Sequence, residues 1–151
     1  MHIHDTDIIH WLFGKPERVS TLGRNVVSIN NGYDAVSAHY YYADGKVLNA
    51  QADWSLEGEH GFEMTFRVNF EKGNLVFKND QLKVNPKDEA GFIADLSGDT
   101  GYYRELEYFT QAVLDDRAIE VCTPESTLGT LEIIEAEMQS ADQGGLWVES
   151  K

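Results

Sequence analysis

A run of alternating residues followed by a tight turn decides the fold of this chain: Val36-Ser37-Ala38-His39-Tyr40-Tyr41-Tyr42-Ala43-Asp44-Gly45. Every second residue from 36 to 42 is apolar or aromatic, and these side chains would share one face of a strand because successive side chains point to opposite faces. Asp-Gly is a favoured sequence for a two-residue hairpin turn. The run therefore predicts one arm of an antiparallel hairpin, and its partner would extend from Val47 to about Leu56.

Further strand patterns follow this hairpin. Residues 62–70 alternate between large apolar and polar side chains, which predicts a strand with one buried face. Gly73-Asn74 and Asn79-Asp80 are typical turn pairs, and they would separate short strands at 75–78 and 81–84. Together these segments predict an antiparallel meander.

Three other segments have a helical pattern. The first covers residues 5–13, with Asp5 or Thr6 as the expected cap and Gly14 at the end. The second covers about 102–115, with an apolar stripe that should face inward. The third begins at Thr123-Pro124 and continues to Ser140, before a short closing strand at 146–148.

The order of these elements predicts an α+β fold with an open, mainly antiparallel β-sheet. Its helices should pack on one face of the sheet and leave the other face free for oligomerisation. We expect that free face to carry Tyr41, Ala43 and Trp54, and to form a homodimer or homotetramer.

Composition narrows the classes of protein. The 151 residues fit one domain, and 26 acidic against 12 basic side chains give a net charge of −14, which argues against nucleic acid as a partner. Cys122 is the only cysteine, so no internal disulfide can form. No run of about 20 apolar residues is present, and the N-terminus lacks a signal-peptide pattern. We therefore expect a cytoplasmic protein without a membrane partner.

The N-terminal segment concentrates chemically active side chains, because His2, His4 and His10 lie within nine residues together with Asp5 and Asp7. His-x-His could bind a metal if the segment were extended. Alternatively, His4 could accept a proton from an alcohol during hydride transfer. In a third interpretation, His2 and His10 are ordinary surface residues and Asp5 only caps the helix.

The segment from His4 to Pro16 resembles the start of the C-terminal domain of the Gfo/Idh/MocA family, which takes its name from glucose-fructose oxidoreductase, inositol dehydrogenase and rhizopine catabolism. In that family a His-Asp-x-Asp motif opens a helix that ends in Trp-Leu and Gly-x-Pro before a strand. The resemblance continues in order through the rest of the chain, at Ala52-Asp53-Trp54, Phe70-Glu71-Lys72-Gly73-Asn74-Leu75, Tyr103-Arg104-Glu105-Leu106-Glu107-Tyr108-Phe109, Thr123-Pro124-Glu125-Ser126 and Leu131-Glu132-Ile133-Ile134-Glu135-Ala136.

The resemblance implies that residues 1–151 are the C-terminal substrate and oligomerisation domain of an oxidoreductase, and that its N-terminal Rossmann domain is absent from this chain. The parent enzyme would transfer a hydride between NAD or NADP and a sugar, inositol or related polyol, with His4 as its catalytic base. We select four candidate substrate-binding residues: Asp7, Trp54, Tyr102 and Tyr103.

The chain contains no Gly-x-Gly-x-x-Gly dinucleotide fingerprint. We therefore expect no cofactor bound to this chain alone, no activity from it, and no metal ligands in it. Two alternatives stay open. One is a metal-dependent small-molecule enzyme of barrel type that uses His2 and His4, and the other is a non-catalytic dimerisation module.

Overall fold

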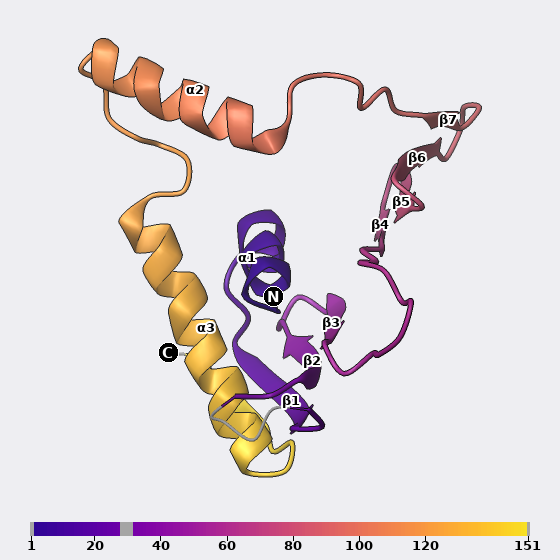
Figure 1. The fold of residues 1–151 in the computed structure, drawn as a ribbon, viewed down its shortest axis with the longest axis vertical. Coiled ribbons are helices and arrows are strands. Elements are labelled where there is room, and N and C mark those ends of the chain that lie inside the picture. Colours follow the sequence, from indigo (N-terminus) through magenta and orange to yellow (C-terminus); the bar gives the residue numbers. More distant parts are fainter. Residues whose placement is uncertain (1, 28–31, 151) are drawn as a thin grey trace. The chain divides into compact units, whose positions relative to one another are not determined.

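The structure is a computed structural model that describes residues 2–27 and 32–150 (Figure 1). Its chain divides into two compact units, of which the first comprises Met1–Glu57 and Ile119–Lys151 and the second comprises Gly58–Ala118. Each unit contains one four-stranded antiparallel sheet. Among the described residues, no helix is both long and apolar enough to cross a membrane.

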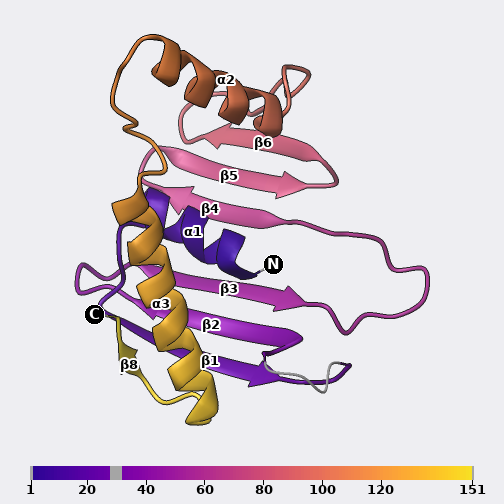
Figure 2. The same ribbon diagram turned by 60° about the vertical axis from the view of Figure 1, so that its left-hand side comes forward.

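The first unit is a sheet covered by two helices. The sheet has the strand order β3-β2-β1-β8, and Figure 2 shows α1 and α3 on one side of β1, β2 and β3. Its elements are α1 (His2–Phe13), β1 (Arg18–Arg24), β2 (Ala35–Tyr41), β3 (Val47–Asp53), α3 (Pro124–Asp142) and β8 (Val148–Glu149).

The core of the first unit lies between this sheet and α3. Val19 of β1, Ala38 of β2 and Ile133 of α3 are fully buried there. Ser140 ties the end of α3 to the sheet, because its Oγ accepts a hydrogen bond from the Thr21 backbone N–H at 2.8 Å and donates to the Leu146 carbonyl at 2.6 Å. Successive side chains of a strand point to opposite faces of the sheet. The sequence neighbours of Val19, Thr21 and Ala38 therefore point away from the helices.

The second unit is a meander followed by a helix. Its sheet has the order β4-β5-β6-β7, and Phe66 of β4 stacks on Phe77 of β5 with ring centroids 5.5 Å apart. Gly73 begins β5 with φ +148°, and a Cβ there would lie 2.3 Å from the backbone oxygen of Asn85, so the turn requires glycine. The elements are β4 (Phe66–Phe70), β5 (Gly73–Lys78), β6 (Gln81–Pro86), β7 (Phe92–Ile93) and α2 (Gly101–Leu114).

The predicted fold class is confirmed: the protein is α+β, its strands pair antiparallel, and neither sheet closes into a barrel. The predicted hairpin forms around Asp44-Gly45 with Tyr41 paired to Val47, but residues 42–46 connect its strands, so the connection is longer than the expected two-residue turn. Thr123 caps α3 by accepting a hydrogen bond from the Ser126 N–H.

Several local predictions are wrong. The helix α1 begins at His2, so Asp5 and Thr6 lie inside it and do not cap it. The strand expected over 62–70 covers only Phe66–Phe70, and on its apolar face Phe66 and Phe70 are exposed while Val68 is half-buried. Ala43 lies in the turn after β2. The apolar stripe of α2 is also exposed, since its only buried residue is Ala112. The residue pattern alone predicts neither β1 nor β7.

Candidate functional site

The helix α1 presents two different faces. Thr6 and Ile9 are buried on the face that packs toward α3 and the sheet. His4 lies on the opposite face and is exposed. Ile8 and Trp11 follow His4 at helical spacing and are 52% and 70% exposed, so His4 belongs to an outward stripe with two large apolar side chains.

Asp7 and His10 join α1 to α3 through one buried hydroxyl. Thr130 of α3 is 2% exposed, and its Oγ1 donates to Asp7 Oδ1 at 2.7 Å. His10 Nδ1 lies 3.0 Å from Thr130 Oγ1 and donates to this oxygen when Thr130 gives its own proton to Asp7. Gly129 allows this close approach, since a Cβ there would lie 2.6 Å from the His10 ring. The interpretation of His10 as an ordinary surface residue is therefore wrong.

His2 belongs to a second buried network on the inward face. Its Nε2 lies 3.0 Å from Glu137 Oε2, and the Glu137 side chain is only 3% exposed. Thr6 Oγ1 donates to Glu137 Oε1 at 3.2 Å and lies 3.3 Å from the Tyr40 hydroxyl. His2 is thus a helix-packing residue, and its interpretation as a surface residue is also wrong.

Charge and burial act against each other at His2. Burial by itself lowers the pKa of His2, but the carboxylates of Asp5 and Glu137 outweigh it and raise the pKa from 6.5 to about 9. Burial, followed by the nearby charge of Glu137, raises the pKa of the Tyr40 hydroxyl well above its usual range. The network therefore holds a protonated imidazole beside a carboxylate at neutral pH.

The helical conformation of α1 also contradicts the alternative in which His2 and His4 bind a metal ion together. Two residues apart on a helix, these side chains point about 200° apart, whereas the alternative needs an extended segment. His2 faces α3 and His4 is exposed. Across residues 2–27 and 32–150, no group of three or more histidine, cysteine or acidic side chains could hold a metal ion.

Trp54 directly follows β3, and its backbone N–H donates to the Asp34 carbonyl at 2.8 Å. Its indole is 62% exposed and lines a cavity together with Ile134 and Met138 of α3. Trp54 therefore lies on the helix-covered side of the sheet, and its expected place on the free face is wrong. Neither His4 nor Asp7 lines this cavity.

Tyr102 and Tyr103 belong to the second unit, at the first turn of α2. They are 82% and 53% exposed, and the Tyr103 backbone N–H donates to the capping Thr100 hydroxyl. The structure thus brings His4 and Asp7 onto one helix and Trp54 into the same unit. Three further residues were not predicted. Glu137 and Thr130 contact α1, and Tyr33 lines the cavity together with Trp54. For Glu137 and Thr130 a signal existed, because both are polar residues inside the buried stripe of α3.

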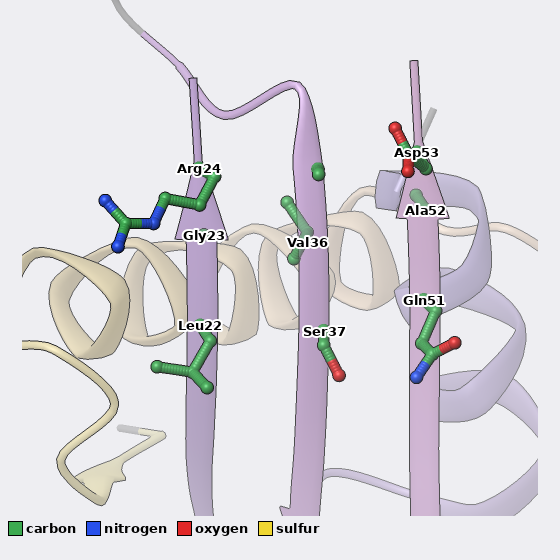
Figure 3. Close-up of a pocket in the computed structure, with 9 residues that line it drawn as sticks. Leu22, Gly23, Arg24, Val36, Ser37, Gln51, Ala52 and Asp53 are labelled. Carbon is green, nitrogen blue, oxygen red and sulfur yellow. The ribbon is translucent and has the colours of Figure 1, made fainter. Parts of the chain in front are cut away.

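The face of the first sheet opposite the helices is open. A hollow of about 490 Å³ lies there over the ends of β1 and β3 and the start of β2 (Figure 3). Its lining includes Leu22, Arg24, Ser37, Gln51 and Asp53.

A cation–aromatic cluster lies on the same sheet. The Arg18 guanidinium lies 4.3 Å from the centre of the Tyr41 ring and 5.8 Å from that of Trp147. Leu22 and Val47 of the same sheet are 62% and 93% exposed. The free face therefore offers both apolar and charged side chains to a binding partner.

Comparison with known proteins gives a family and a fold. The sequence model described as the GFO/IDH/MocA C-terminal domain matches residues 1–76, which is just over half of the chain. No curated protein sequence matches.

Solved structures of similar fold include three oxidoreductases. One from Thermotoga maritima is 24% identical with a TM-score of 0.74, and the match covers 98% of this chain and 42% of that one. One from Agrobacterium radiobacter, in complex with NAD+, L-tartaric acid and magnesium, is 16% identical with a TM-score of 0.78 and coverages of 99% and 48%. Levoglucosan dehydrogenase in complex with NADH is 17% identical with a TM-score of 0.82 and coverages of 100% and 49%. The chain therefore spans less than half the length of each of these three structures.

Proposed function

The chain belongs to the GFO/IDH/MocA C-terminal domain family, and on that premise we propose that it is the substrate and oligomerisation half of an NAD(P)-dependent oxidoreductase of sugars, inositol or related polyols. The observation that carries the proposal is the family match over residues 1–76, which includes the His4-Asp5-Thr6-Asp7 motif with His4 exposed on α1. The complete oxidoreductases of this fold are about twice as long, which supports a second domain in the parent protein.

His4 is the proposed catalytic base. Oxidation of a CH–OH group to C=O removes a hydride from carbon and a proton from oxygen, so the site needs a base within hydrogen-bond reach of that oxygen. The exposed position of His4 supports this role, because a partner domain and a substrate can both reach its imidazole. The apolar side chains of Ile8 and Trp11 beside it would be covered by that domain, which would exclude water from the reacting hydroxyl.

The remaining candidate residues would bind the substrate hydroxyl groups. Asp7 already accepts the Thr130 hydroxyl through Oδ1, and an ionised carboxylate can accept further hydrogen bonds. Tyr102 and Tyr103 offer exposed phenol groups, and the Trp54 indole offers a flat surface for a sugar ring. These assignments follow the family motif and the exposure of each side chain.

The nicotinamide cofactor would bind to the other domain and receive the hydride there. This sequence has no glycine-rich dinucleotide fingerprint, and the residues of this chain therefore do not fit a dinucleotide site of their own. Two of the structures with this fold carry NAD+ or NADH, which supports the same cofactor class in the parent. A single cysteine and no internal disulfide fit a cytoplasmic protein.

The test is catalysis by the product of the complete gene, including any codons upstream of Met1. Reduction of NAD+ and of NADP+ would be followed with a panel of hexoses, inositols and anhydrosugars. We expect His4→Asn to lower kcat by about 10²–10⁴-fold, while the matched variant His60→Asn, at another exposed histidine, leaves it unchanged. Full activity of His4→Asn would contradict the assignment and favour a non-catalytic association module.

The free face of the first sheet is the proposed oligomer interface. Leu22 and Val47 are exposed at its centre and edge, and a second copy would bury them as either a homodimer or a homotetramer. Light scattering after size exclusion should give the mass of a multimer at micromolar concentration. Leu22→Asp should release monomers, whereas Leu114→Asp, at a residue of the second unit that is 73% exposed against 62% for Leu22, should not. A monomeric wild-type protein would refute this interface.

A further inference from the structure

A second cavity lies on the inward side of α1, apart from the outward stripe that carries His4. It has a volume of about 210 Å³ and lies entirely within the first unit, between the first turn of α1, the strands and α3. The residues that matter for its chemistry are His2, Thr21, Trp54, Ile134, Glu137 and Met138.

One buried hydroxyl group in the lining has no internal partner. Thr21 is 2% exposed, and its Oγ1 makes no hydrogen bond to any residue that the structure describes. Leaving a buried hydroxyl unpaired costs about 1–3 kcal/mol, so buried hydroxyls are nearly always paired. Thr21 is a lining residue, and a ligand in the cavity could supply the missing partner.

The charges around the cavity favour a neutral ligand. His2 and Glu137 lie 3.0 Å apart in the lining and compensate each other. The third charge in the lining, the Asp34 carboxylate, already accepts the Val26 and Val27 backbone N–H groups at 2.8 Å. A ligand cation and a ligand anion would each lose their hydration against a mostly apolar lining whose charges already have partners. A hydroxyl group avoids both costs, since it can donate to one oxygen and accept from another donor.

The shape and the walls favour a ring. Most of the lining is apolar, from Ile3, Val36, Ala52, Ile134, Met138 and Ala141, and it includes Trp54, which is 62% exposed. A cavity of about 150 Å³ lined by apolar side chains accommodates benzene. A cavity of about 210 Å³ has room for a six-membered ring with a hydroxyl substituent.

We propose that this cavity is a binding site for a small, neutral ring compound that directs a hydroxyl group to Thr21 and places its hydrocarbon face against Trp54. The cavity differs from the site proposed around His4, because neither His4 nor Asp7 lines it and Trp54 is the one candidate substrate residue that does. A ligand there would contact His2 and Glu137, and through them the first turn of the helix that presents His4.

The test uses three probes that share one ring, namely cyclohexanol, cyclohexylamine and cyclohexanecarboxylate. Binding to the 151-residue chain would be followed by methyl NMR of Ile3, Ile134 and Met138. We expect cyclohexanol to shift these signals with a Kd of about 1 mM or below, within the limit set by its few heavy atoms. The amine and the carboxylate should bind at least about 10-fold more weakly.

Two variants separate the site from nonspecific contact. Thr21→Val removes the hydroxyl with little change of shape and should weaken cyclohexanol binding about 5–10-fold, the value of one hydrogen bond, while Thr65→Val in the second unit should not. Trp54→Ala should also weaken binding, through the lost ring contact. The proposal is overturned if cyclohexanol causes no shift, if the charged probes bind equally well, or if both variants bind like the wild type. None of these outcomes depends on the oxidoreductase activity.

Discussion

Replacing Glu137 with glutamine should reduce the pH dependence that the protonation of His2 gives to the stability of the first unit. Glu137 is 3% exposed and its Oε2 lies 3.0 Å from His2 Nε2, whereas Gln has nearly the same shape and no charge. The carboxamide can still accept the Thr6 hydroxyl, so the change acts mainly on the imidazole.

The magnitude follows from the pKa of His2. The folded protein raises this pKa from 6.5 to about 9, and each pKa unit between folded and unfolded states is worth about 1.4 kcal/mol. The protonated imidazole therefore contributes ~3 kcal/mol to the free energy of unfolding. Because the folded pKa is the higher one, this contribution is complete below pH 6.5 and disappears as the pH rises through 9.

Urea unfolding followed by circular dichroism at pH 6 and pH 9.5 would measure this difference, and NMR of the His2 ring would give its pKa directly. The wild type should lose more stability between the two pH values than Glu137→Gln does, by a part of this ~3 kcal/mol, because Asp5 remains beside His2 in the variant. Glu135→Gln is the matched control, since Glu135 lies on the exposed face of the same helix. Equal pH dependence of wild type and Glu137→Gln, or a His2 pKa near 6.5, would refute the reasoning.

Two further substitutions test the packing of α3. Ile133 is fully buried, so Ile133→Ala should lower the free energy of unfolding by about 2–5 kcal/mol, whereas Leu131→Ala, at a residue 44% exposed, should cost far less in the same urea titration. Thr130→Val should cost about 1–3 kcal/mol, because it leaves Asp7 and His10 without their shared hydroxyl. Thr127→Val on the exposed face should be close to neutral, and an equal loss in both threonine variants would show that the hydroxyl network contributes nothing.

The sequence predicts those parts of the fold whose signals are local. The alternation at 36–42 and the Asp44-Gly45 turn fix β2 and its pairing with β3, and Thr123-Pro124 fixes the start of α3. The first strand escapes prediction because Arg18 to Arg24 mixes polar and apolar residues on its free face. The start of α1 is also missed, because no capping residue marks it in the sequence. The contact of His2 with the buried Glu137 stabilises this first turn, and the local sequence does not reveal that contact.

The site is predictable only as far as the family motif extends. His4 and Asp7 follow from that motif, and their places on α1 agree with a helix that opens there. Glu137 and Thr130 interrupt the apolar stripe of α3, which signals that they are buried, but their partners His2 and Asp7 lie more than 100 residues away. Thr21 lies on a strand with no motif of its own. Their partners are defined by tertiary packing, which a period of 2 or 3.6 residues does not encode.

The three tryptophans are distributed so that each reports on a different surface. Trp11 belongs to the outward stripe of α1, Trp54 lines the small cavity, and Trp147 lies beside Arg18 on the sheet. Variants that keep one indole at a time would give three independent fluorescence channels. Domain docking, ligand entry and self-association could then be followed separately in the same protein without an added label.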